Sequence, residues 1–354
     1  EAGALRFGGS NDLQLAGTVT LVGGNRGIGN YSGNRKLTIS GNVNLGSNNA
    51  VFNGVAAGPN GTTEISGVIS GTGALDLNVS FLNGLAILSA NNNFSGGVTV
   101  STGARQVGVG GAVGTLGTGA VTITGGEVLI NRSGAATFSN NFTLNANAKV
   151  TVAGGAITFD GATFNLSNSA GNRTLSVASG QSMTLNNGNL GGFGANAPTL
   201  VLEGEGTGVI NKSLASGSGA GSVVKNDSGT WTLTSTATNY GGPTTVNGGT
   251  LLVNGSISGN VIVNALGTLG GNGTINGNVS GTGTFSPGNS PGAMTINGNF
   301  TPAGTVNFEV NSPWSAAGTN FDQYIVSGIV DLSAATLTFT NNLDTSAPAV
   351  NSLL

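Results

Sequence analysis

The sequence predicts an all-β protein in which short parallel strands coil into a β-solenoid. Three observations support this fold class: short runs that alternate apolar and polar residues, abundant glycine and asparagine between them, and motifs that recur about one coil apart. In runs such as "TVTLV", "KLTIS" and "KVTVA", alternation places Val, Ile and Leu on one face of a strand and Thr or Ser on the other. No stretch with a helical period interrupts these runs, so we expect no helical layer.

Internal repeats set the expected size of a coil. The pattern polar–Ile–Ser/Asn–Gly–Asn–Val/Phe occurs at 38–43, 256–261, 274–279 and 295–300, and its last three copies follow one another closely. Their spacing predicts coils of about 18–21 residues, or roughly 17–19 coils over the whole chain. A sandwich or barrel is also rich in strands, but echoes at one-coil spacing are not expected there.

The glycine-rich stretches are interpreted as corners between strands. In "GTLGGNGTINGNVSGTGTFSPGNSPG" (267–292), only four large apolar residues are available for burial. Glycine and asparagine accept the positive φ angles that tight corners require. A single coil buries about half a dozen side chains worth roughly 2 kcal/mol each, against ~1–2 kcal/mol of backbone entropy per residue. Stacking on neighbouring coils is therefore needed for stability.

Composition excludes several classes of protein. Hydrophobic residues make up 38% of the chain and charged residues only 6%, whereas disordered chains carry many charges and few aliphatic residues. Every Lys and Arg lies at or before Lys225, so no basic surface for nucleic acid is expected. No apolar run reaches the ~18 residues of a transmembrane helix. Because the chain begins at Glu1 and shows no signal peptide, we expect a processed chain or an excised fragment.

The sequence offers few candidates for chemistry. It has no Cys or His, which removes disulfides, the usual nucleophilic triads and soft-metal sites. Glu203 and Glu205 are the only acidic pair at strand spacing, and such a pair could act as acid and base or bind calcium. Only Lys225 and Asp227 lie one coil away from them, so a solvated face is the favoured interpretation. We predict no catalytic residue, no metal and no cofactor.

Other candidate binding features have simpler structural explanations. Trp231 and Tyr240 could stack on sugars, but 231–246 aligns without gaps on 85–100, where Leu85 and Phe94 take their places, which favours core packing. The segment "SPGNSPG" (286–292) is typical of consecutive turns rather than a ligand loop. An ice-binding array is not predicted, because the Thr-x-Thr pairs are too scattered; they occur at 18–20, 122–124, 232–234 and 336–340. Arg35 and Lys36 are expected on a solvated edge.

One region resembles a known family. The motifs are "GTWTL", an N-Y/F-x-G-x-T-T-V centre, a G-G-T-L-x-V close and the following "SPGNSPG", found here at Gly229–Leu233, Asn239–Val246, Gly249–Val253 and Ser286–Gly292. They resemble the autotransporter-associated β-strand repeat, also called the passenger-associated transport repeat. Segment 84–109 is similar to a weaker copy, and 321–339 resembles a stretch found downstream in such proteins. The resemblance implies a right-handed parallel β-helix in the passenger of a Gram-negative surface protein.

These observations together predict one continuous solenoid over 1–354, with the best repeat match at 229–292 and a strand-rich C-terminal end at 293–354. The expected function is a non-enzymatic extracellular stalk or passenger, displayed on or released from a bacterial surface. One alternative is a subunit that self-associates head to tail into an extracellular filament or sheath. Another is a β-helix that binds or processes glycans, against which the scarcity of charge counts. The expected partners are a second copy, a surface glycan or other cells.

Overall fold

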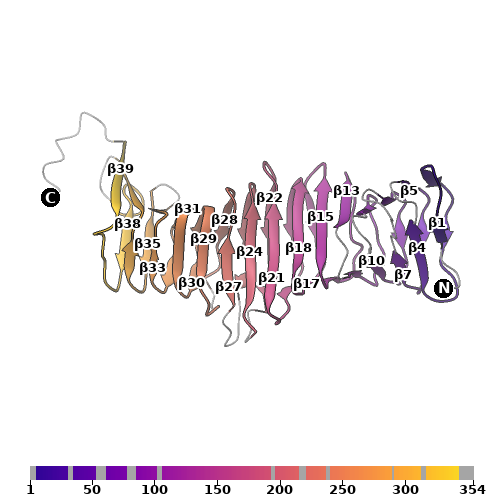
Figure 1. Cartoon of the computed structure of the whole chain (residues 1–354), viewed down its shortest axis with the longest axis horizontal. Coiled ribbons are helices and arrows are strands. Elements are labelled where there is room, and N and C mark those ends of the chain that lie inside the picture. Colours follow the sequence, from indigo (N-terminus) through magenta and orange to yellow (C-terminus); the bar gives the residue numbers. More distant parts are fainter. Residues whose placement is uncertain are drawn as a thin grey trace.

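Stacked coils form an elongated rod, with β1 (Leu5–Phe7) and β39 (Thr336–Asn342) at opposite ends of it (Figure 1). The computed structural model describes residues 5–30, 35–52, 61–77, 85–101, 106–192, 196–214, 221–236, 240–288, 291–311 and 316–342. Every ladder between strands in these ranges is parallel, and none of these residues is helical, which confirms the predicted all-β parallel solenoid. The first residues of the predicted 1–354 solenoid and the last of its 293–354 end lie outside the described residues.

Each complete coil supplies up to three strands, so that three stacks run along the rod. Stack A contains β1 (Leu5–Phe7), β4 (Arg26–Asn30), β7 (Ala50–Phe52), β10 (Leu75–Leu77), β12 (Val98–Val100), β14 (Val121–Ile123), β17 (Phe142–Leu144), β20 (Phe164–Leu166), β23 (Asn189–Leu190), β26 (Ser213–Leu214), β30 (Ser256–Ser258), β32 (Thr274–Asn276), β35 (Ala293–Ile296) and β38 (Gln323–Val326). Stack B contains β2 (Leu13–Leu15), β5 (Lys36–Ile39), β8 (Thr62–Ile65), β11 (Leu85–Leu88), β13 (Gln106–Gly111), β15 (Gly126–Arg132), β18 (Ala148–Gly154), β21 (Gly171–Val177), β24 (Pro198–Gly204), β27 (Ser222–Lys225), β33 (Val279–Gly281), β36 (Phe300–Pro302) and the first halves of β29 (Thr244–Val253) and β31 (Val261–Gly271). Stack C contains β3 (Val19–Thr20), β6 (Val43–Asn44), β9 (Ile69–Ser70), β16 (Ala136–Phe138), β19 (Ala156–Phe159), β22 (Ser182–Leu185), β25 (Thr207–Ile210), β28 (Thr230–Leu233), β34 (Thr284–Pro287), β37 (Thr305–Asn311), β39 (Thr336–Asn342) and the second halves of β29 and β31.

Coil length varies along the rod. The shortest coils contain the repeated motif, where Thr244 pairs with Val261 and Val261 pairs in turn with Val279. Most other coils are longer, as the pairing of Gly171 with Pro198 shows. The predicted coil length is thus too short for most of the rod, which makes fewer coils than expected. The reason is that the predicted length came from the spacing of the last three copies of the motif, which stack in the tightest coils.

The recurring motif forms a ladder of asparagines at one corner. Its last three copies stack in register, with Ile257 on Ile275 and Ile275 on Ile296. The amide oxygen Oδ1 of Asn278 accepts a hydrogen bond from the backbone N–H of Asn299 at 2.8 Å, and the Asn260 oxygen does the same for Asn278 at 3.0 Å. These side chains satisfy backbone donors that the corner leaves without a strand partner. The motif therefore stabilises a corner between two strands.

The first copy of the motif, at 38–43, occupies a different corner. It joins β5 of stack B to β6 of stack C, whereas the later copies join stack A to stack B. The chemistry is nevertheless the same, because Asn42 Oδ1 accepts a hydrogen bond from the N–H of Val68 in the next coil at 3.1 Å. Similar sequence thus marks similar corner geometry rather than a fixed side of the rod.

One hydrophobic core runs through the rod from Phe7 to Val306. Alternation along each strand turns Val, Ile, Leu and Phe inward, where each layer packs on the layers before and after it. Aromatic rings stack between successive coils, as Phe142 does on Phe164 with centroids 5.4 Å apart. The core leaves the outward positions mostly to Thr, Ser and Asn, so the rod has a polar but weakly charged surface.

Candidate functional site

The two acidic residues that the sequence singled out have separate environments. Glu203 lies in β24 and forms an ion pair with Lys149 of β18, with the charged atoms 2.6 Å apart. Gly204 follows with φ +92° and ends the strand, so the alternation that predicted a shared direction stops there. Glu205 is exposed beyond that point. No three His, Cys, Asp or Glu side chains gather to hold a metal ion within the described ranges.

A cavity of about 530 Å³ opens beside Glu205, at the corner where stack B turns towards stack C. We call it the corner pocket. Its lining comes from four consecutive coils, which stack over roughly 14 Å of the rod. The residues are Thr151, Ser176, Val177, Ala178, Ser179, Gly204, Glu205, Asp227 and Ser228. Hydroxyl and carboxylate groups therefore line the pocket beside Ala178, while the Val177 side chain is fully buried, and this arrangement is suited to hydrogen bonding.

Asp227 fixes the shape of the corner pocket. It adopts φ 56°, an uncommon value for a residue other than glycine, and its Oδ2 accepts a hydrogen bond from the backbone N–H of Gly204 at 2.9 Å. This bond joins two successive coils at the pocket wall. Asp227 is thus a structural part of the pocket as well as one of its two carboxylates.

Beneath this corner lies the fully buried side chain of Lys225. Its ammonium donates hydrogen bonds to the backbone carbonyls of Asp227 at 2.8 Å and Gly248 at 3.0 Å, and also to that of Asn226. Desolvation lowers the pKa of Lys225 to about 8, although attraction to Asp227 raises it in part. From the sequence, Lys225 was expected only as a neighbour of the acidic pair. A signal was available, because alternation in "SVVK" places Lys225 on the same inward face as Val223.

Arg173 and Lys212 are two further buried cations that the sequence analysis missed. The Arg173 guanidinium donates to the backbone carbonyls of Ser167 at 2.6 Å and Gly171 at 2.7 Å. Lys212 Nζ donates to the carbonyl of Gly161, two coils earlier, at 2.9 Å. Burial lowers the pKa of both groups. Their donors face backbone carbonyls, so they tie corners together.

The predicted core positions of Trp231 and Tyr240 are confirmed. Both side chains are fully buried, as is Phe94 in the aligned segment. The Trp231 indole N–H donates to the Glu203 carbonyl at 3.4 Å, and the Tyr240 hydroxyl bonds to Thr244 Oγ1. A sugar-stacking role for the two rings is excluded by this burial.

The gapless alignment of the two segments is wrong at its start. Leu85 is only half-buried, whereas Ala86 and Leu88 point into the core. The corner between Leu88 and the buried Phe94 is one residue shorter than the corner between the buried Leu233 and Tyr240. Alternation determines which residues within one strand face inward. The number of residues in a corner determines where that alternation starts again in the next strand.

Threonines form one column on stack C. Seven of them occupy successive coils in register, and a glycine precedes all but the last; they are Thr207, Thr230, Thr250, Thr268, Thr284, Thr305 and Thr336. The next outward column mixes residue types, for example Leu252, Gly270 and Ser286. The threonines line up on successive coils, which their spacing in the sequence did not indicate. They nevertheless form a single column and not a flat array.

Two other expectations concern exposed loops. In "SPGNSPG", Gly288 has φ +85° and exchanges two backbone hydrogen bonds with Gly271, in keeping with a turn, although residues 289–290 lie outside the described residues. Arg35 and Lys36 are both exposed, and Lys36 pairs with Glu64 at 2.5 Å.

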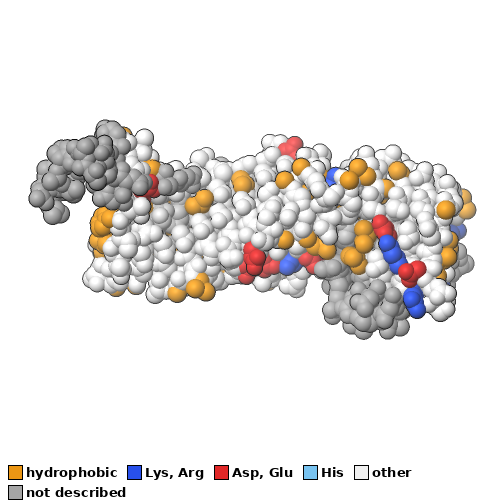
Figure 2. Space-filling view, turned by 90° about the horizontal axis from the view of Figure 1, so that it is seen from above, with side chains coloured by type: hydrophobic (Ala, Val, Ile, Leu, Met, Phe, Trp, Pro, Cys, Tyr) orange, Lys and Arg blue, Asp and Glu red, His pale blue; other side chains and the backbone are white. Residues whose placement is uncertain are grey.

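Figure 2 shows charged side chains in a row near the N-terminal end and in a group midway along the rod, on an otherwise weakly charged face.

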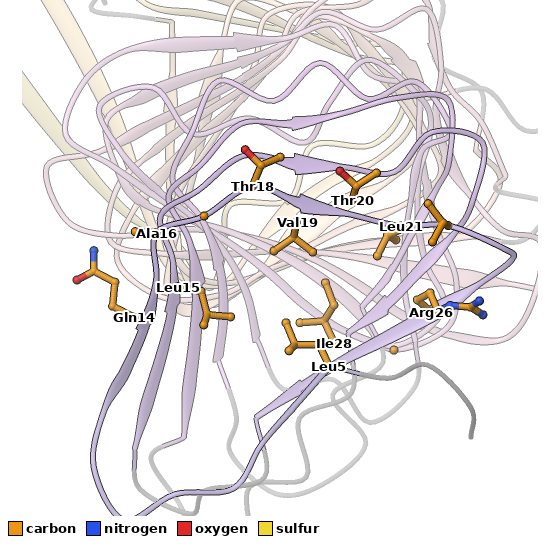
Figure 3. A pocket seen from close by; sticks show the side chains of 13 residues that line it. Leu5, Gln14, Leu15, Ala16, Thr18, Val19, Thr20, Leu21, Arg26 and Ile28 are labelled. Carbon is orange, nitrogen blue, oxygen red and sulfur yellow. The ribbon is translucent and has the colours of Figure 1, made fainter.

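A second cavity, of about 520 Å³, lies at the N-terminal end of the rod. Figure 3 shows Leu15, Val19 and Ile28 among the apolar side chains around its centre, with Arg26 at the side. The Arg26 guanidinium donates to the carbonyl of Gly23 at 2.8 Å. We call this cavity the end pocket. Inward apolar side chains of the first coils surround its centre, which suits an apolar surface, while Gln14, Thr18 and Thr20 lie at its edge.

The comparisons with known proteins agree with the resemblance noted above. The family model of the passenger-associated transport repeat matches residues 83–104 and 223–253, and the second match contains Trp231 and Tyr240. The adhesin BmaC autotransporter of Brucella suis biovar 1 (strain 1330) is 28% identical over 230 residues, which cover 64% of this chain and 5% of that relative. No solved structure matches the chain. Among the described residues, no helix is long and apolar enough to cross a membrane.

The strands that precede the buried aromatic residue use different sides of the rod in the two matched segments. Leu88 precedes Phe94 and lies in stack B, whereas Leu233 precedes Tyr240 and lies in stack C. In both segments a corner separates that strand from the buried aromatic residue. The chain thus contains two matches to the passenger-associated transport repeat within a parallel solenoid, and it is similar to a short part of an autotransporter adhesin of a Gram-negative bacterium.

Proposed function

We propose that the chain is a non-enzymatic rod that extends an autotransporter passenger away from the bacterial surface. The observation that carries this proposal is the continuous parallel ladder and single core from the first coils to the last. Each coil is stabilised by its neighbours, so the assembly resists bending at any one point. The buried cations and asparagines serve corners, which supports a structural role for the polar groups.

Two measurements test this proposal. Small-angle X-ray scattering of the purified chain is expected to give the profile of a thin rod, and a compact globular profile would contradict it. Incubation with pectin, alginate and similar glycans is expected to give no turnover. Turnover that disappears in Glu203→Gln would show instead that the ion-paired carboxylate belongs to a catalytic site.

A second candidate function is head-to-tail association of copies. It is supported by the apolar end pocket and by the exposed Ile329 and Phe339 near the other end, which are each 66% exposed. Charge is complementary as well, because Arg26 lines the end pocket while Asp331 is exposed near the opposite end. Strands of all three stacks run parallel, so a second copy stacked in the same direction would extend each ladder.

Sedimentation at increasing protein concentration tests this association. Leu15→Lys, which places a charge in the end pocket, is expected to abolish it. Val113→Lys is the matched control, since Val113 is an exposed apolar residue (54%) away from both ends. A single sedimentation coefficient at all concentrations, for the unmodified chain, would contradict this second candidate.

A further inference from the structure

We propose that the corner pocket binds a short neutral or basic saccharide. The proposal adds a ligand to the rod described above and rests on its display at the surface. It concerns the cavity of about 530 Å³ lined by Glu205, Asp227 and the surrounding hydroxyl residues. The chemistry of the lining, its rigidity and its charge each narrow the class of ligand.

The lining suits a molecule that carries many hydroxyl groups. Ser176, Ser179 and Ser228 offer hydroxyls that both donate and accept, and Glu205 and Asp227 offer carboxylates that only accept. A saccharide presents the complementary set, because each of its hydroxyls can donate to a carboxylate and accept from a serine. Ala178, which is half-buried, adds a small apolar surface for the C–H face of a sugar ring.

The pocket is held in shape before a ligand arrives. Its wall is tied across coils by the bond from Gly204 N–H to Asp227 Oδ2 at 2.9 Å. The carbonyl of Asp227 is held in turn by the buried ammonium of Lys225 at 2.8 Å. Lys225 is therefore a positioning residue that lies beneath the pocket. A rigid site loses less conformational entropy when a ligand binds. A ligand that makes only weak polar contacts can therefore still bind there.

The charge of the pocket selects among saccharides. Both ionisable side chains in its lining are acidic, the nearby Lys149 is paired with Glu203, and the buried ammonium beneath them donates to backbone carbonyls. Acidic sugars are therefore repelled, whereas the ammonium of an amino sugar gains a charge-assisted hydrogen bond. A divalent cation is a poorer fit, because Asp227 Oδ2 is engaged by a backbone N–H and no third acid joins the two among the described residues.

Calorimetric titration of the whole chain at pH 6.5 tests the proposal with three tetrasaccharides, made of glucosamine, N-acetylglucosamine or galacturonate. We expect the glucosamine tetramer to bind most tightly, the N-acetylglucosamine tetramer to bind more weakly and the galacturonate tetramer not to bind. Glu205→Gln is expected to weaken glucosamine binding by about tenfold, because it removes one charge-assisted hydrogen bond. Asp331→Asn is the matched control, since it removes an exposed carboxylate outside the pocket.

Three results would overturn the proposal: no binding of any tetramer, tightest binding of the galacturonate tetramer, or equal loss of affinity in Glu205→Gln and Asp331→Asn. Melting temperatures of both variants are compared with that of the unmodified chain, so that unfolding is not mistaken for loss of the site. Because Glu205 is exposed, the fold is expected to tolerate its replacement. A rod-like scattering profile without saccharide binding would leave the rod function standing and remove only this ligand.

Discussion

Gly208 lies directly against Trp231 in the next coil. The two residues pair in register between β25 and β28, and a Cβ atom on Gly208 would stand 2.2 Å from the indole Cε3. Both strands turn these positions inward, so the absent side chain of one residue makes room for the largest side chain of the other. The glycine is a packing residue here, and its φ angle is an ordinary one.

Gly208→Ala is therefore expected to destabilise the chain by about 1–3 kcal/mol, the usual cost of overpacking a core. Denaturant unfolding followed by Trp fluorescence measures the change. Gly134→Ala is the control, because a Cβ on Gly134 meets no atom within 4 Å. Equal stability of the two variants would mean that the indole moves aside freely.

Asn278→Ala is expected to cost about 0.5–1.5 kcal/mol, since the N–H of Asn299 loses its acceptor at 2.8 Å. Asn278→Asp retains an oxygen in the same place and is expected to cost less. Hydrogen exchange of the Asn299 amide gives a local measurement, with faster exchange in the alanine variant only. Unchanged exchange in both variants would show that water replaces the side chain without cost.

Stability is expected to change little between pH 5 and 8, because the chain has no histidine. Above pH 8 it is expected to rise. The folded pKa of Lys225 is about 8, below its ordinary value of 10.5, so between these values the unfolded chain binds more protons than the folded chain. Stability therefore increases with pH from about 8 towards 10, where ionisation of tyrosines in the unfolded chain begins to oppose it.

Thermal melts of the unmodified chain and of Lys225→Met separate this effect from others. The methionine variant loses hydrogen bonds to three carbonyls, so it is expected to be less stable throughout, with a smaller rise above pH 8 that reflects the lowered pKa of Lys212. Parallel curves for the two proteins would contradict the assignment of the rise to Lys225.

Glu203→Gln is expected to change stability by less than about 1 kcal/mol, because its ion pair with Lys149 is partly exposed, with side-chain exposures of 23% and 35%. Its effect is also expected to shrink as salt is added. Urea unfolding at low and high salt provides the measurement. A loss of several kcal/mol would indicate that the pair supports the corner pocket more than its exposure suggests.

The fold class, the corner glycines and the burial of Trp231 followed from the sequence because alternation and glycine act over a few residues. The half-buried position of Leu85 did not follow from the sequence. A corner that is one residue shorter reverses which side chains of the strand face inward. The corner pocket was predicted only in part. Coil spacing placed Asp227 about one coil from Glu205, but the register that pairs Thr199 with Ser222, and the corner that follows it, could not be read from the sequence.

The strands that precede the buried aromatic residue occupy different stacks in the two passenger repeats, and this bears on how such a chain can grow. If similar segments fit on any side, then a duplication need not contain a whole coil to be accommodated. Adding one strand with its corner would leave the ladder intact but turn every later segment by one stack. A small change in length would thus turn every segment beyond it towards a different side of the rod.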